Sequence, residues 1–226
     1  MKPIFLLITV LFVFSCGKEK VVLLPEISHS EITEIFDVSP AYLFYDETQK
    51  DSVELNRKNL ISTTNWLVNV DKRLTLKQAI PLIKFIQEKK QNSSHKNEKA
   101  KNYFTCNDTS RKNLGFIEFT NVVYYLGSSN DYFKTQSKST PKAPSIGINI
   151  DLNNNITIIN PDSDHFIIQT NKENVINHLK KMTLDAKTVY LNFNKALSFQ
   201  DYISFKSLVL SINKDSIYIS NNEFIY

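Results

Sequence analysis

The side chains best suited to catalysis are one thiol and one imidazole. Cys106 lies eleven residues after His95, and a thiolate formed with the help of a histidine is the nucleophile of many thiol-dependent enzymes. No family signature surrounds Cys106, and a lone thiol is more often inert than reactive. A thiol-dependent enzyme is therefore an alternative interpretation, and it predicts that the pKa of Cys106 is depressed.

The sequence carries no other catalytic or metal-binding pattern. The four histidines form none of the spacings typical of metal sites, and they are His29, His95, His165 and His178. Glycine-rich phosphate loops and the Gly-x-Ser-x-Gly turn are absent from the sequence as well. We therefore expect no metal, no cofactor and no enzymatic activity.

The second cysteine, Cys16, lies at the end of an apolar amino-terminal segment. Residues 3–14 form an apolar run that follows Lys2 and ends before Ser15 and Cys16. The run is too short to span a bilayer, and its flanks are those of a signal peptide. This segment resembles a bacterial lipobox, which implies that the chain is cleaved before Cys16 and that Cys16 is lipidated. Cys106 is then left without a partner for a disulfide.

The expected lipid determines where the protein acts. Acyl chains add about 0.8 kcal/mol of membrane affinity per buried methylene, so two or more chains give stable anchoring. Gly17 stands where many bacteria place an aspartate that retains a lipoprotein in the inner membrane. The resemblance therefore implies a bacterial cell-envelope protein that is anchored to the membrane, with the outer membrane favoured.

Composition sets further bounds. Hydrophobic residues make up 42% of the 226 residues and aromatic residues 12%, which is ample for a packed core. The net charge is +4 and the lysines are dispersed, a distribution that does not indicate a nucleic-acid partner.

One strand-and-helix element occurs in both halves of the chain. In each copy a buried strand leads to a helix that starts after a hydroxyl residue, Thr75 or Ser198, and Gln78 or Asp201 follows three residues later as in a capping box. These matches favour an internal repeat. At a constant spacing of 123 residues the identities are Asn69 and Asn192, Lys72 and Lys195, Leu74 and Leu197, and Ile80 and Ile203.

Periodicity predicts the remaining elements. Helices are expected at 76–90, 173–181 and 199–212, and Pro81 should kink the first of them. Strands are expected at 41–45, 52–56, 66–70, 116–119, 122–125, 146–150, 156–159, 189–193 and 217–219.

These elements predict an α+β fold with two tandem small mixed-sheet domains, each with helices packed on one face, after a lipoprotein signal peptide. The expected boundaries are a signal peptide at 1–15, a lipidated tether at 16–38, a first domain at 39–126, a linker at 127–143 and a second domain at 144–226. The linker is rich in Ser, Thr, Lys and Pro.

The second half places Ile-Gly-Ile-Asn-Ile-Asp in its opening strand, Val-Tyr-Leu-Asn-Phe-Asn-Lys in its central strand and exit, and Leu-Ser-Phe-Gln-Asp at the next helix start; these segments are 146–151, 189–195 and 197–201. This order resembles the periplasmic domain of the ExbD/TolR family of biopolymer-transport proteins, and the first half matches it more loosely through 68–72 and 74–76. The resemblance implies an extracytoplasmic module that dimerises and contacts envelope partners or cell wall.

One departure limits what the resemblance implies. Members of the family couple proton flow to work through an aspartate in an amino-terminal transmembrane helix. Here the run at 3–14 contains no acidic residue and should be removed. We therefore expect a non-catalytic interaction or transport-accessory module that binds a protein partner or associates with itself, rather than a motor. A small-ligand binding protein with a cleft between the halves is a further alternative.

A polar segment at 91–113 interrupts the first half where the repeat predicts a tight connection. Long loops without internal structure are commonly functional or disordered. Basic and aromatic residues in this segment could contact anionic headgroups or an acidic partner, although a solvated excursion is the more common outcome for such a loop. The candidate contact residues are Lys96, Lys99, Lys101, Tyr103 and Phe104.

Overall fold

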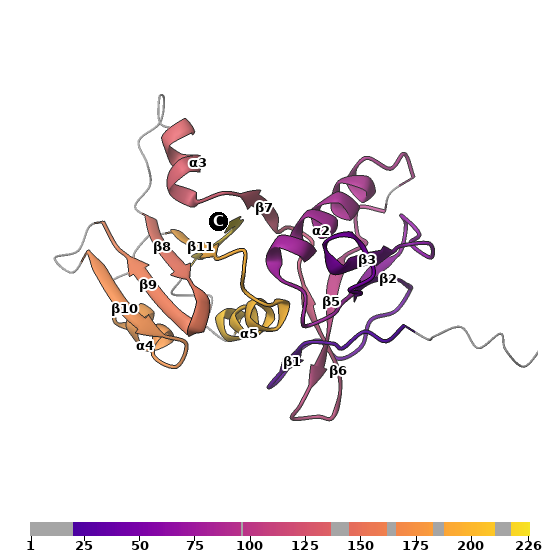
Figure 1. Cartoon of the computed structure of the whole chain (residues 1–226), viewed down its shortest axis with the longest axis horizontal. Coiled ribbons are helices and arrows are strands. Elements are labelled where there is room, and N and C mark those ends of the chain that lie inside the picture. The colour runs from indigo at the N-terminus through magenta and orange to yellow at the C-terminus, as the bar shows by residue number, and fades with distance from the viewer. Residues whose placement is uncertain (1–19, 96, 137–144, 162–165, 183–187, 211–217) are drawn as a thin grey trace, which may run out of the picture.

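The computed structural model describes residues 20–95, 97–136, 145–161, 166–182, 188–210 and 218–226. Within these ranges the chain forms two mixed sheets of six strands each, which lie in separate lobes on either side of helix α5 (Figure 1). The predicted α+β fold with two small mixed sheets is confirmed.

The first sheet is built by the first half of the chain, and its central order is β3-β2-β4-β5. β2 is antiparallel to β3 and parallel to β4, and β4 is parallel to β5. The elements are β1 (Glu26–Ile27), β2 (Val38–Tyr45), β3 (Val53–Asn56), β4 (Asn65–Val70), α2 (Leu76–Gln91), β5 (Asn102–Asp108) and β6 (Asn113–Glu118), of which β1 and β6 both pair with β5.

The second sheet has the order β10-β9-β8-β11-β12-β7. β8 is antiparallel to β9 and parallel to β11, and β11 is parallel to β12. Its elements are β7 (Val123–Leu126), α3 (Ser129–Gln136), β8 (Ser145–Ile150), β9 (Asn155–Ile159), β10 (Ile167–Asn171), α4 (Val175–Lys181), β11 (Thr188–Phe193), α5 (Phe199–Leu210) and β12 (Tyr218–Ile225).

The repeat is confirmed in three dimensions, because β3-β2-β4-β5 and β9-β8-β11-β12 have the same order and the same strand directions. β4 and β11 are offset by 123 residues, and so are the starts of α2 and α5. Both helix starts carry the expected caps. Gln78 Oε1 accepts from Thr75 N at 2.8 Å, and Ser198 Oγ accepts from Asp201 N at 3.1 Å. α2 continues through Pro81 to Gln91.

The two copies meet at these helix starts through reciprocal main-chain hydrogen bonds. Leu76 N donates to Leu197 O at 2.9 Å, and Phe199 N donates to Leu74 O at 2.7 Å. The first bond becomes the second when 123 is added to the number of its donor residue and subtracted from the number of its acceptor residue, so the junction has local two-fold character. A second reciprocal pair joins Lys77 N to Lys195 O at 2.9 Å and Gln200 N to Lys72 O at 3.2 Å.

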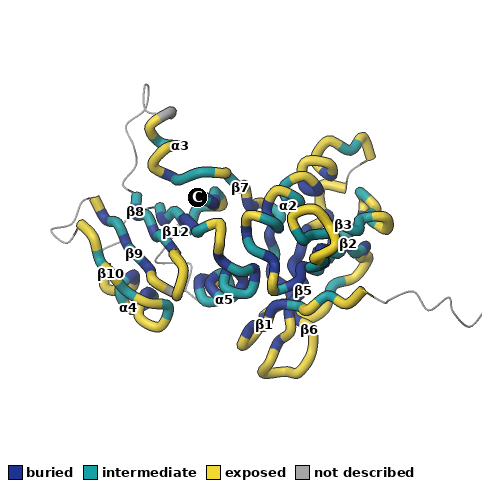
Figure 2. The backbone as a smooth tube through the Cα atoms, viewed as in Figure 1, coloured by how far each residue is buried: buried dark blue, intermediate teal, exposed yellow. Residues whose placement is uncertain are grey.

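Aromatic side chains fill the junction beside these bonds. Phe104 of β5 stacks on Phe119 with ring centroids 3.8 Å apart. The same ring meets Phe199 and Tyr202 of α5 edge-on, at 5.2 and 6.3 Å. Buried apolar residues of both halves therefore form one continuous core, visible in Figure 2 as dark blue positions in both sheets and along α5. The place between the halves is packed rather than open.

Three segments differ from the expectation. The strand expected at 122–125 is β7, and it pairs with β12 in the second sheet, not with the first sheet. The stretch expected as a linker contains α3, whose Phe133 contacts Tyr190 on the sheet face opposite to the one that α5 covers through Phe193. The stretch expected as a polar insertion contains β5 at the centre of the first sheet.

Candidate functional site

A groove of about 880 Å³ opens in the first half between β3 and the carboxyl end of α2. Trp66 lies in its wall, and the indole is fixed because Nε1 donates to Ile61 O at 2.7 Å. The lining residues are Glu54, Leu55, Asn56, Arg57, Lys58, Leu60, Ser62, Trp66, Ile86, Lys89, Lys90, Asn92, Ser93 and Ser94.

The groove is basic. Arg57, Lys58, Lys89 and Lys90 line it, and among the described lining residues only Glu54 is acidic. Glu54 is itself paired with Lys20. No acidic side chain in the described part of the chain pairs with Arg57, Lys58 or Lys89. The guanidinium of Arg57 instead lies over the Phe85 ring, 5.3 Å from its centroid. The positive charge of the groove is therefore largely uncompensated.

Lys90 contributes a buried charge to this wall. Its side chain donates to three neutral oxygens, Thr64 O at 3.2 Å, Lys101 O at 3.3 Å and Asn102 Oδ1 at 2.8 Å. Its ammonium also lies 4.7 Å from the centroid of the Trp66 ring. Burial lowers the pKa of Lys90 to about 8, because no carboxylate offsets the loss of hydration. An anion bound in the groove would supply the missing opposite charge.

The amino-terminal end of the described chain enters the fold at the rim of this groove. Residues 20–32, the N-terminal strap, pack onto the body. Lys20 Nζ lies 2.9 Å from Asp46 Oδ2 and also pairs with Glu54 of the groove. Leu23 N donates to Asp71 Oδ2 at 3.2 Å, and Lys72 N donates to Leu23 O at 2.7 Å. The described part of the expected tether is therefore bound to the body rather than free.

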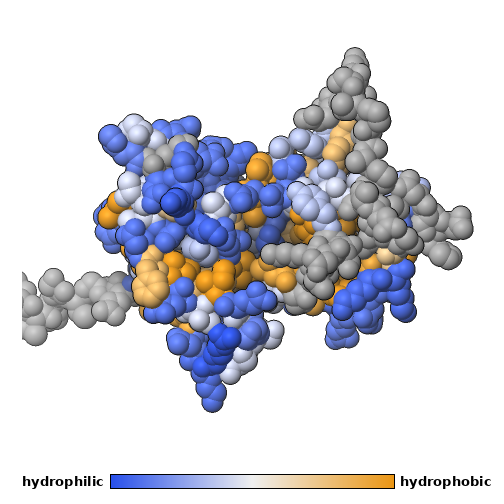
Figure 3. All heavy atoms as spheres, turned by 180° about the vertical axis from the view of Figure 1, so that it is seen from behind, coloured by the Kyte–Doolittle hydropathy of each residue, from blue (hydrophilic) through white to orange (hydrophobic). Residues whose placement is uncertain are grey.

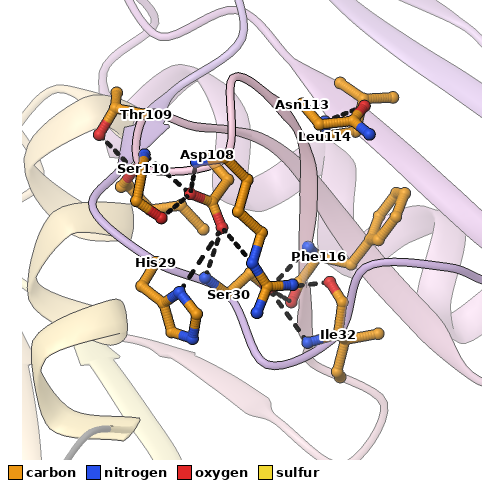
Figure 4. Close-up of polar contacts among 11 residues, drawn as sticks. His29, Ser30, Ile32, Asp108, Thr109, Ser110, Asn113, Leu114 and Phe116 are labelled. Carbon is orange, nitrogen blue, oxygen red and sulfur yellow. Dashed lines mark hydrogen bonds and ion pairs between the residues drawn. The ribbon is translucent and has the colours of Figure 1, made fainter.

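The strap also joins the two halves. Glu26 N donates to Gln200 Oε1 at 2.8 Å, and Gln200 Nε2 donates back to Glu26 O at 2.9 Å. At its far end, Ser30 N donates to Asp108 Oδ2 at 2.8 Å (Figure 4). Hydrogen bonds from Ser110 and from neighbouring backbone amides hold the pKa of Asp108 down at about 2. The strap is therefore fixed at both ends and at the junction.

The candidate contact residues of the polar insertion do not form one surface. Tyr103 and Phe104 are buried in β5, at 8% and 0% exposure, so their assignment as contact residues is wrong. Lys99 and Lys101 are exposed, and Lys101 pairs with Glu118 at 2.8 Å. Lys96 lies outside the described residues. The exposed polar residues of the segment lie in two places, between α2 and β5 and at the tip of the β5–β6 hairpin. The hairpin tip projects from the body as a hydrophilic point when seen from behind (Figure 3).

The remaining candidates from the sequence are Cys16 and Cys106. Cys16 lies outside the described residues. Cys106 is fully buried in β5, and burial raises the pKa of its thiol to about 12. This is the opposite of the depressed pKa that a thiol nucleophile requires. His95, in contrast, is exposed.

Comparisons with known proteins give no match. No family model, curated protein or solved structure matches the chain. In the described ranges, no helix is long and apolar enough to cross a membrane, and no three His, Cys, Asp or Glu side chains gather as metal ligands would.

Sequence reasoning missed the groove because its charges come from two distant segments, 57–58 and 89–90. The pair at 89–90 reads as the basic last turn of a helix, which favours the helix dipole and needs no further explanation. Only the pairing of β3 with β2, and the packing of α2 beside β3, bring the two segments to one surface.

Proposed function

We propose that this protein is a non-catalytic lipoprotein of the bacterial cell envelope, anchored through Cys16, whose basic groove contacts anionic lipid headgroups. The two halves, which resemble ExbD/TolR periplasmic domains in sequence, act as one rigid module that presents its other surfaces to a protein partner or a second copy. The observation that carries the proposal is the docking of the strap beside the groove.

Chain length limits how far the groove can lie from a lipid on Cys16. The four residue steps from Cys16 to Lys20 span at most about 15 Å when fully extended. Lys20 is bound to Glu54, which lines the groove. A lipidated Cys16 would therefore hold the rim of the groove within reach of the headgroups, and the far lobe with α4 away from them (Figure 1).

The charge of the groove suits that position. Basic residues near an anionic membrane surface contribute about 1 kcal/mol each to binding, over a distance limited by the screening length. Arg57, Lys58 and Lys89 have no acidic partner among the described residues, so their charges are not neutralised there and are available to headgroups. Contact with headgroups would fix the orientation of the body as well as its location.

The anchor itself is tested by labelling cells with radioactive palmitate and fractionating their membranes. The protein should take up label and sediment with membranes, whereas Cys16→Ala should stay unlabelled and be released with its domains folded. A protein that fails to label refutes the anchor.

The groove is tested separately on the chain that starts at Gly17 and has no lipid. Vesicles of phosphatidylcholine with phosphatidylglycerol should bind it, and the triple variant Arg57→Gln, Lys58→Gln, Lys89→Gln should bind at least about tenfold more weakly. The control removes the same charge elsewhere, with Lys112→Gln, Lys180→Gln and Lys181→Gln. Equal losses in both variants would show a diffuse charge effect and no role for the groove.

A further inference from the structure

A second, smaller cavity of about 120 Å³ lies in the other half of the molecule, between the amino-terminal turn of α3 and the face of the second sheet that α3 covers. Strands β8 and β11 form its floor with Gly147, Asn149, Tyr190 and Asn192. The other lining residues are Ser128, Ser129, Asn130, Phe133, Ser145, Ile159, Pro161 and Tyr226.

The side chain of Asn192 is the unusual feature of this cavity. It is 2% exposed, and its Oδ1 accepts from Ser129 N at 2.9 Å. That bond fixes which end of the amide faces α3. The opposite end, Nδ2, has no hydrogen-bond acceptor among the described residues. An unpaired buried donor costs about 1–3 kcal/mol, so such groups commonly have a partner that completes them.

Gly147 leaves the space beside this amide open. A Cβ at position 147 would stand 4.0 Å from Asn192 Nδ2 and 3.9 Å from Ile159 Cβ, which is ordinary contact distance. An alanine methyl group at 147 would therefore occupy the space next to the unpaired N–H group without forcing the fold to move.

The lining restricts the chemistry of a ligand. Among the residues that the structure describes, the lining contains no Lys, Arg, His, Asp or Glu, so those residues would offer a charged ligand no opposite charge in return for its lost hydration. The ligand must bring an acceptor to Asn192 Nδ2, and the serine and asparagine side chains of the lining are of types that both donate and accept. Hydroxyl groups do both. The rings of Phe133 and Tyr190, 4.9 Å apart, supply an apolar wall.

From this geometry we infer that the cavity binds a small uncharged polyhydroxyl group, with one hydroxyl oxygen accepting from Asn192 Nδ2. The volume corresponds to about four waters at roughly 30 Å³ each, which suits a short polyol or one edge of a sugar ring. The site is independent of the anchor and of the basic groove, since it lies in the other lobe and shares no lining residue with the groove.

Two variants isolate the site. Gly147→Ala fills the space beside the amide and keeps every hydrogen bond of Asn192. Asn69→Ala is the matched control, because Asn69 occupies the same position in the first half. Asparagine-selective ¹⁵N labelling of the full chain in detergent makes the side-chain amide of Asn192 observable by NMR.

The experiment titrates this sample with glycerol, erythritol, ribose, glucose and N-acetylglucosamine. At least one compound should shift the Asn192 amide signal saturably. Gly147→Ala should lower the affinity for that compound at least fivefold, and Asn69→Ala should leave the affinity unchanged. A response limited to glycerol and erythritol identifies a free polyol, and a response to the ring compounds identifies a sugar edge. Failure of every probe to shift the signal, or equal binding to Gly147→Ala, overturns the inference.

Discussion

Asn69 and Asn192 are the same residue at the same position of the two repeats, and their side chains have different partners. In the first half, Asn69 Nδ2 donates to Ala41 O at 3.0 Å and to Leu67 O at 3.3 Å. In the second half, Asn192 Nδ2 has no acceptor among the described residues, although Oδ1 accepts from Ser129 at the start of α3. The difference follows from what covers each asparagine.

The strand beside each asparagine, β2 in the first half and β8 in the second, also differs at the equivalent position. Pro40 lies opposite Leu67 in the first sheet, whereas Gly147 lies opposite Tyr190 in the second. In the first half no helix forms between β1 and β2, and in the second half α3 follows β7 and covers the sheet. The two copies of the repeat therefore carry different features: the first half has the basic groove and the second half has the cavity beside Asn192.

The largest expected effect on stability comes from disrupting the aromatic core that the two halves share. Phe104→Ala removes a fully buried ring that packs on both halves, so it should lower the free energy of unfolding by about 3–5 kcal/mol. Urea unfolding should be followed by Trp66 fluorescence, which reports the first half, and by far-ultraviolet circular dichroism, which reports both. The two curves should coincide. Separate transitions would contradict a single core.

The next largest effect is expected for alanine variants of the two equivalent asparagines, Asn69 and Asn192. Asn69→Ala should lower the free energy of unfolding by about 1–2 kcal/mol, since it removes two hydrogen bonds of a polar side chain. Asn192→Ala should lower it by less, because the loss of one hydrogen bond is partly offset by the removal of the unpaired Nδ2 donor. Only Asn192→Ala takes away the acceptor of Ser129 N, so only this variant should speed amide hydrogen exchange in α3. Equal exchange rates for α3 in the two variants would mean that Asn192 does not hold the helix.

The charge of Lys90 predicts a pH dependence in the first half. The folded state loses this proton near pH 8 and the unfolded chain keeps it until about 10.5, so the unfolded state binds more protons between these values. Stability should therefore rise from pH 8 to pH 9.5, by on the order of 1–2 kcal/mol. Urea titrations across this range should show the rise, and Lys90→Met should remove it. An unchanged slope in Lys90→Met would assign the dependence to another group.

The smallest effect belongs to Gly147→Ala. The added methyl group meets its neighbours at ordinary contact distances, and alanine restricts the unfolded chain more than glycine does. The thermal midpoint should stay constant or rise slightly, corresponding to at most about 1 kcal/mol. A clear loss of stability would show that the space beside Asn192 is smaller than the structure indicates.

The sequence was sufficient to predict the parts of the fold that follow local rules. β4 alternates between buried and partly exposed positions throughout and β11 does so over its first four residues, and Thr75 and Ser198 carry the caps that start both helices. These patterns predicted both elements and their repeat, because amphipathic periodicity and capping are properties of neighbouring residues.

The sequence did not reveal β5 because its polar residues are satisfied by distant partners. Asn102 accepts from Lys90, and Asp108 accepts from Ser30 of the strap, so residues that resemble a loop lie buried in a central strand. Similarly, α3 is polar by composition and is held by the contacts of Tyr132 and Phe133 with the second sheet. The groove and the Asn192 cavity depend on such long-range placement and are invisible to pattern reading.

Spin labels at two positions test the proposal that a lipid on Cys16 turns the basic groove toward the membrane. Because Cys106 is buried and its pKa is raised, a spin label can be placed selectively on Lys58→Cys at the groove or on Lys180→Cys on α4 in the far lobe. Electron paramagnetic resonance of the lipidated protein in anionic vesicles compares relaxation by a lipid-bound nickel chelate. We expect strong relaxation for the label at 58 and little for the label at 180. Equal relaxation at both positions, or stronger relaxation at 180, would contradict the proposal.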